Sequence, residues 1–301
     1  MPLHPSTPAR GPVLALTRAP GSGPGAGEAW RVRIDETIRL GHAHRVRGHY
    51  AEAGRLLRAA LRDAEAHLRA APSAEASAAL VSACNELGVT FKYSGRFDEA
   101  RRLYERALGI LERTVGPGHV HVATIYHNLG GLAHARGDYR DAEGPARRAV
   151  AIRERALGPA HVDVAADRAA LAPILMALGE PQEAAALLED ALRIFEEAGD
   201  SHLHDVAVTL HNLAALAFGR HDHEKAAVLF HRSLALKEHL LGPAHPGLTP
   251  TLVNLAVLHT RTGAPGKARV LYTRAERILG ATVEPTHPTL LAVRRELSRL
   301  P

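Results

Sequence analysis

Histidine is the side chain that most readily suggests chemistry in this sequence, with 20 copies among 301 residues. A metal site needs three or four ligands within about 2 Å of one ion, and two histidines four residues apart on a helix commonly supply two of them. His127 and His134 are seven residues apart, and the pairs at 119/121, 202/204 and 221/223 offer only two rings each. We therefore expect no specific metal site, and we expect the histidines between elements to cap helix ends or face water.

Recognisable catalytic motifs are missing from the sequence. The stretch HEKAA at 223–227 begins like a zinc-protease motif but lacks its second histidine, and the glycines at 21, 23, 25 and 27 precede no strand-like segment. The single cysteine, Cys84, has no CxxC partner for zinc or redox chemistry. We expect a non-enzymatic protein without a cofactor, and an enzyme using scattered His and Glu is the least favoured alternative.

The elements that must position these side chains follow a repeat of 42 residues. Four histidines in the junctions are separated by 42, 84 and 42 residues, namely His119, His161, His245 and His287. The same step relates the glycines at 95, 137, 179 and 263, with His221 in the remaining register, and an alanine follows each of them five residues later. Small residues at these spacings allow two antiparallel helices to cross closely, and large residues such as Tyr104 are expected to fill the space to the next pair.

This pattern resembles the tetratricopeptide repeat, over roughly residues 30 to 280. The resemblance is carried by a small residue in the middle of a first helix, by turns such as GRFDEA (95–100) and GDYRDA (137–142), and by a small residue late in the second helix. The usual period is about 34 residues, and the longer form is similar to the repeats of kinesin light chain and of many bacterial repeat proteins. The resemblance implies an all-α fold, an α-solenoid of about six antiparallel helix pairs, whose first helices line a concave groove.

The repeat predicts the boundaries of the elements. We expect a disordered Pro/Gly-rich tail at 1–27, a solenoid at 28–280 with helix pairs at about 29–70, 76–115, 119–157, 161–198, 203–241 and 245–280, and a capping helix at 287–299. Leu290, Leu291, Leu297 and Leu300 are expected to cover the open apolar end of the stack. Pro173 is expected to kink its helix, and Pro145 either does the same or shifts the start of its helix.

The asparagines give the most specific indication of a binding site. Asn128, Asn212 and Asn254 share one register of the first helix, and Glu86 and Ala170 complete that series. The resemblance places this register on the inner face, where an amide can both donate to and accept from a bound peptide unit. The predicted partner-binding residues are Asn85, Lys92, His127, Asn128, His134, His211, Asn212, Asn254 and Arg261. The alternative, compatible with the first, is that the amides hydrogen bond between neighbouring repeats.

Charge and hydropathy exclude several classes of partner. Residues 1–70 carry 11 Arg against six acidic residues, whereas residues 71–301 carry 26 of each sign, so we expect no nucleic-acid binding by the repeat body. No segment approaches 18 consecutive apolar residues, so we expect no membrane span. A lone cysteine fits a reducing, cytoplasmic location, and the oligomeric state stays open.

Three functions follow in order of preference. The first is a non-enzymatic adaptor or scaffold that binds a peptide or a partner protein's segment in the groove. The second is a ligand- or peptide-sensing regulatory module that acts on a transcription or signalling partner. The third is the enzyme considered above. Neutral Asn and His on the inner face do not favour recognition of an acidic carboxy-terminus.

Overall fold

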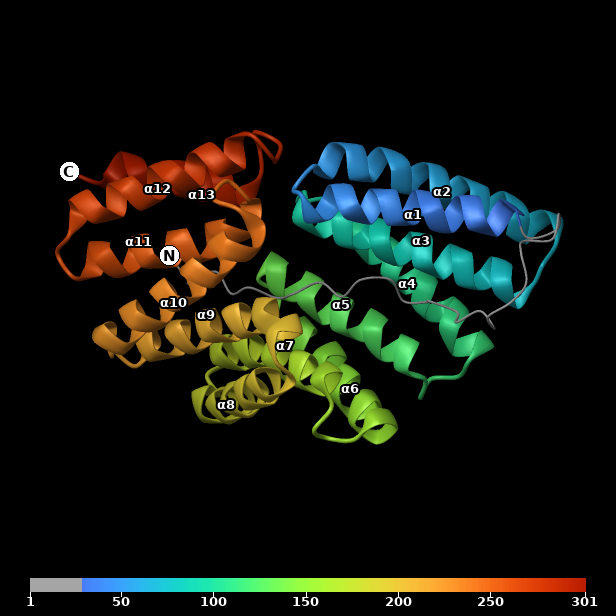
Figure 1. The fold of residues 1–301 in the computed structure, drawn as a ribbon, viewed down its shortest axis with the longest axis horizontal. Helices are drawn as coiled ribbons and strands as arrows, with labels where there is room; N and C mark the ends of the chain where they lie inside the picture. The colour runs from blue at the N-terminus through green and yellow to red at the C-terminus, as the bar shows by residue number, and fades with distance from the viewer. Residues whose placement is uncertain (1–28) are drawn as a thin grey trace. The chain divides into compact units, whose positions relative to one another are not determined.

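The computed structural model describes residues 29–301, so the predicted tail at 1–27 lies outside the described residues. All regular elements in this part of the chain are helical, and they follow one another in chain order in Figure 1. The α helices are α1 (Ala29–Val46), α2 (Tyr50–Ala70), α3 (Ala74–Tyr93), α4 (Phe97–Thr114), α5 (Val120–Arg136), α6 (Tyr139–Leu157), α7 (Val162–Leu178), α8 (Pro181–Ala198), α9 (Leu203–Gly219), α10 (His223–Leu241), α11 (Thr249–Arg261), α12 (Pro265–Gly280) and α13 (Pro288–Arg299). Short 3-10 turns at Asp200–His202 and Pro246–Leu248 precede α9 and α11.

The described residues form two compact units, 29–137 with α1 to α5 and 138–301 with α6 to α13. The division lies in the turn between α5 and α6, although the 42-residue repeat makes these two helices a single pair. Within each unit, successive helices pack against one another, and first helices also contact the first helices of neighbouring repeats. This is the arrangement expected of stacked helix pairs.

Close helix crossings explain the small residues in the middle of the first helices. A Cβ added to Gly88 would lie 2.6 Å from a ring carbon of Tyr104, and one added to Gly41 would lie 2.6 Å from Cγ of Leu57. Tyr104 therefore fills the space against the first helix of its own pair, and not only the space towards the next pair. Alanines at the same register in later repeats, Ala172, Ala214 and Ala256, are fully buried.

The recurrent junction histidines are helix caps. The Nδ1 atoms of His119, His161, His245 and His287 accept hydrogen bonds from backbone N–H groups two residues later, at 3.2, 3.1, 2.9 and 3.2 Å. Each bond satisfies one of the backbone donors left free at a helix start. Gly158 and Gly242, which end the preceding helices, have φ of +85°, a conformation that favours glycine. The prediction that junction histidines cap helices is confirmed at these four positions.

Helices α6 and α7 continue through Pro145 and Pro173, and the kinks expected at these prolines stay predictions. One sequence prediction needs correction. In the terminal helix, Leu290 is buried against the last core cluster, and Leu297 and Leu300 are partly buried there. Leu291 instead points to solvent with 46% of its surface exposed, and Val293 takes the buried place, because a helix turns about 100° per residue and only one stripe of α13 faces α12.

First and second helices differ in how they are buried. Second helices such as α4 and α10 bury one stripe and expose the other face, whereas α3 is buried continuously from Ala79 to Lys92. Similar runs occupy most of α5, α7, α9 and α11. The predicted binding residues all lie on first helices, and all except Arg261 are therefore in the interior of the described structure.

Candidate functional site: polar contacts between first helices

An amide pair joins the first helices of the second and third repeats. Asn128 Nδ2 on α5 donates to Asn85 Oδ1 on α3 over 2.7 Å, and both side chains are fully buried. The remaining amide atoms, Asn85 Nδ2 and Asn128 Oδ1, have no hydrogen-bond partner among residues 29–301. The pair thus presents one donor and one acceptor beyond its internal bond.

A longer chain of hydrogen bonds joins α9, α10 and α11. Asn254 Nδ2 lies 3.2 Å from His211 Nε2, His211 Nδ1 lies 3.0 Å from Thr251 Oγ1, and Lys237 Nζ donates to Thr251 Oγ1 over 2.9 Å. Because an amide nitrogen can only donate, Nε2 of His211 accepts and its Nδ1 carries the proton in this arrangement. All four side chains are almost completely buried. Asn212 makes the equivalent contact one repeat earlier, donating to the carbonyl of Ala169 over 3.4 Å.

Three of the predicted binding residues, Lys92, His134 and Arg261, lie further along the first helices, and their surroundings differ. Lys92 is buried, its pKa is lowered to about 8 by burial and then by Arg45, and its Nζ lies 5.1 Å from the centre of the Tyr93 ring. His134 on α5 is buried as well. Arg261 is exposed at the end of α11, with its guanidinium 5.1 Å from the centre of the Phe218 ring. Lys92 and His134 belong to the first unit, and Arg261 belongs to the second.

The structure therefore brings together Asn85 with Asn128 and His211 with Asn254, and it places His127 and Asn212 in the interior. These are hydrogen bonds between neighbouring repeats, as in the alternative interpretation of the asparagine register. Whether the same residues bind a partner stays a prediction, because fully buried amides contact a ligand only if the helices around them move.

Two buried ionic sites were not anticipated from the sequence. In the first unit, Glu86 Oε2 is 3.2 Å from Arg45 Nη2 and 3.0 Å from His42 Nδ1, which ties α3 to α1. In the second, Arg153 Nη1 on α6 contacts both carboxylate oxygens of Asp167 on α7 at 2.7 Å.

The signal for the second ionic site was present in the repeat. Arg153 and Lys237 occupy a second-helix register that holds Leu111, Phe195 and Leu279 in other repeats, all buried. A cation at a position that is otherwise apolar indicates a buried charge, which needs a partner. Burial alone lowers the pKa of Lys237 to about 7, and Lys237 in turn contributes to a lowered pKa at His204.

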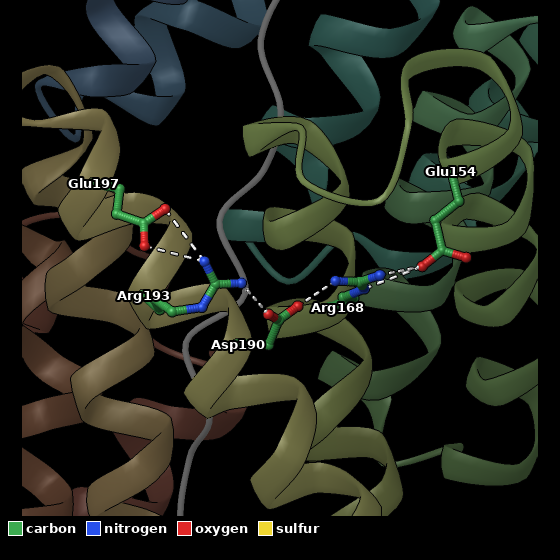
Figure 2. Close-up of polar contacts among 5 residues, drawn as sticks. All are labelled: Glu154, Arg168, Asp190, Arg193 and Glu197. Carbon is green, nitrogen blue, oxygen red and sulfur yellow. Dashed lines mark hydrogen bonds and ion pairs between the residues drawn. The ribbon is translucent and has the colours of Figure 1, made fainter.

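On the exposed side of α6, α7 and α8, acidic and basic residues form a chain of ion pairs. Figure 2 shows Arg168 between Glu154 and Asp190, and Arg193 between Asp190 and Glu197. A second exposed arginine, Arg147, contacts Glu183 at 2.8 Å and Glu143 at 2.7 Å. Such contacts link neighbouring helices, and exposed pairs of this kind stabilise by at most about 1 kcal/mol each.

The described side chains include no group of three or more His, Cys, Asp or Glu that could hold a metal ion. Burial raises the pKa of the Cys84 thiol to about 12, so the thiolate that would act as nucleophile or ligand is disfavoured. No described helix is both long and apolar enough to cross a bilayer.

Comparisons with known proteins agree with the repeat geometry. Models of the tetratricopeptide repeat match residues 75–155, 168–198 and 205–281, so the chain belongs to the tetratricopeptide repeat family. No curated protein sequence matches the chain.

Solved structures with the same fold include BtubC (BKLC) from P. vanneervenii, with 22% identity and a TM-score of 0.53 over 86% of this chain and 92% of that one. A Rap protein complexed with Competence and Sporulation Factor matches with 13% identity and a TM-score of 0.57, over 83% and 77% of the two chains. The apo form of RapI matches with 13% identity and a TM-score of 0.54, over 88% and 70%. These likenesses establish an all-α solenoid fold. Membership of the tetratricopeptide repeat family in general supports a protein-interaction scaffold.

Proposed function

We propose that this chain is a non-enzymatic adaptor that binds a peptide or an extended segment of a partner protein along the first helices of its repeats. The observation that carries the proposal is the amide pair of Asn85 and Asn128. Its unused donor and acceptor match the carbonyl and N–H that one residue of an extended peptide presents on the same side. Support also comes from the Rap protein, a fold relative whose structure is a complex with Competence and Sporulation Factor.

Burial of the pair favours a related second function, a regulatory module that senses its ligand by a change of shape. Both amides are fully buried, so a peptide would reach them only if α3 and α5 separate or turn. Binding of this kind couples occupancy to the curvature of the repeat stack, because a ligand that prefers one arrangement shifts the population towards it. Small-angle scattering with and without ligand would measure that change.

A displayed peptide library, selected on the full chain, tests the proposal. We expect a selected peptide to lose about tenfold in affinity on the double replacement Asn85→Ala/Asn128→Ala, since two hydrogen bonds are removed. Ser233→Ala is the matched control, because it removes a buried hydrogen bond of 2.6 Å to Ala207 elsewhere in the chain. Equal affinity in both variants would reject the amide pair, and a selection that enriches no peptide would reject peptide binding.

A further inference from the structure

The exposed faces of α10 and α12 carry the same pattern of three residues. We define the α10–α12 ridge as Lys225, Val228 and Arg232 on α10 together with Lys267, Val270 and Arg274 on α12. The two triplets are related by the 42-residue step, so they occupy equivalent positions on successive second helices. Arg274 Nη1 donates to Glu238 Oε1 on α10 over 2.5 Å, which shows that the two helices are neighbours at the surface.

The apolar members of the ridge are unusually open to solvent. Val228 is 56% exposed and Val270 is 69% exposed, the two highest values among large hydrophobic residues in the described chain. The equivalent position on α8 is occupied by Ala186, which offers less apolar surface. Two exposed valines at one register on neighbouring helices form a regular feature and not scattered surface residues.

Three of the four charged members of the ridge lack counter-charges among the described residues, while Arg274 is paired with Glu238. Lys225, Arg232 and Lys267 are exposed and make no ion pair with any residue of 29–301. The equivalent positions on α8 are the acidic residues Glu183 and Asp190, and both are engaged by arginines of the same unit. Lys225, Arg232 and Lys267 are therefore available to a partner's charges, whereas Glu183 and Asp190 are not.

Charge is distributed unevenly along this unit. Residues 138–205 carry 14 acidic against seven basic residues, whereas residues 206–301 carry six acidic against 12 basic. Because these excesses nearly cancel, residues 71–301 as a whole carry equal numbers of acidic and basic residues. An excess of uncompensated positive charge attracts and orients an oppositely charged partner.

From these observations we propose that the α10–α12 ridge docks an acidic amphipathic segment of a partner protein. Carboxylates of the segment would face Lys225, Arg232 and Lys267, while its apolar side chains cover Val228 and Val270. A phosphate backbone would use the cations but gain nothing from the exposed valines, which is why a protein segment fits better than a nucleic acid. A second copy of this chain fits less well, because the acidic residues at the matching positions of α8 are already paired.

The test uses the full chain and a synthetic helical peptide of about 18 residues, five helical turns, with leucine on one face and glutamate on the others. Fluorescence anisotropy should report saturable binding that weakens at least tenfold in Lys225→Glu/Lys267→Glu and several-fold in Val228→Ala/Val270→Ala. All four positions are on the surface, so the helical content should not change. Arg62→Glu/Arg102→Glu is the matched control, since it reverses two exposed charges on the second helices α2 and α4 and should leave binding unchanged.

Three outcomes would overturn the proposal. A peptide of the same composition in scrambled order that binds equally well would show attraction of charge alone. A DNA duplex that binds more tightly and is released by the same variants would assign the ridge to nucleic acid. Self-association that disappears in Lys225→Glu/Lys267→Glu would assign it to a second copy. The Asn85→Ala/Asn128→Ala variant should bind the acidic peptide normally, which separates failure of this proposal from failure of groove binding.

Discussion

Two sites in the second unit, built from the same repeat register, handle a buried cation in different ways. Arg153 on α6 and Lys237 on α10 are 84 residues apart, and 2% and 1% of their surfaces are exposed. Across the junction to the next first helix, Arg153 meets the carboxylate of Asp167, whereas Lys237 meets the hydroxyl of Thr251 at the equivalent position. The repeat places the two cations alike, and one residue on the neighbouring helix decides whether the cation meets a carboxylate or a hydroxyl.

The difference is expressed in the protonation of the cation. A guanidinium stays charged in proteins and therefore requires a counter-charge when buried. An ammonium can lose its proton, and burial lowers the pKa of Lys237 to about 7. The Arg153 site is thus a fixed ion pair, while the Lys237 site can change its charge near neutral pH.

The largest effect is expected from removing the counter-charge of the fixed pair. Asp167→Ala should lower the free energy of unfolding by about 3–5 kcal/mol, because it leaves a buried guanidinium uncompensated. Urea denaturation followed by circular dichroism measures the change. Replacing both partners, as in Arg153→Met/Asp167→Leu, should restore most of the loss, and a double variant as unstable as the single one would contradict the explanation.

The pH dependence of stability should identify the second site. The pKa of Lys237 in the folded state, about 7, lies below the ordinary lysine value of 10.5, so between these values the unfolded chain binds more protons. The free energy of unfolding should therefore rise with pH across this window, by at most about 1.4 kcal/mol per pH unit from this group, and the penalty should be constant below pH 7.

Variants at the second site provide the comparison. Lys237→Met should remove the contribution between pH 7 and 10.5, and Thr251→Asp should remove it as well by placing a carboxylate where Asp167 stands in the other site. Denaturation curves at several pH values, with the parent chain as reference, measure it. Identical slopes in all three chains would show that Lys237 does not titrate in this range.

A smaller loss is expected from removing the hydroxyl. Thr251→Val keeps the side-chain volume but deprives Lys237 and His211 of a shared hydrogen-bond partner, which should cost about 1–2 kcal/mol. The expected order, Asp167→Ala above Thr251→Val, follows from the loss of a charge in one case and of a dipole in the other. Reversal of that order in urea denaturation would undermine the comparison of the two sites.

The smallest effect concerns the turns between the first and second helices of repeats four and five. Gly179 has φ of +87°, and the equivalent residue His221 has φ of 63°, the one positive value for a non-glycine residue in the described chain. A side chain in this region costs about 1 kcal/mol relative to glycine. His221→Gly should therefore raise the free energy of unfolding by up to about 1 kcal/mol, and Gly179→Ala should lower it by a similar amount. Thermal melts of the two variants check the opposite signs.

The sequence predicted the fold well because repeated local signals report on local structure. The junction histidines and the turn glycines act within one or two turns of helix, and Gly88 acts on the other helix of its own pair, so their spacing alone indicates paired helices. The all-α solenoid and the family are accordingly confirmed. The candidate site was predicted less completely. The asparagine register was found, but its contacts, Asn128 with Asn85 and Asn254 with His211, depend on the neighbouring repeat.

By itself, then, the sequence determined the period, the helix pairs and the capping of each junction, because these follow from steric and hydrogen-bonding rules that operate along the chain. Only the tertiary structure decided which polar side chains are buried and what they meet. Packing between helices of neighbouring repeats joins Asp167 to Arg153, Thr251 to Lys237, and the amide of Asn85 to that of Asn128. The contribution of a polar side chain to stability depends on its burial and on the group that faces it. The facing group comes from the neighbouring repeat, so a single repeat does not identify it.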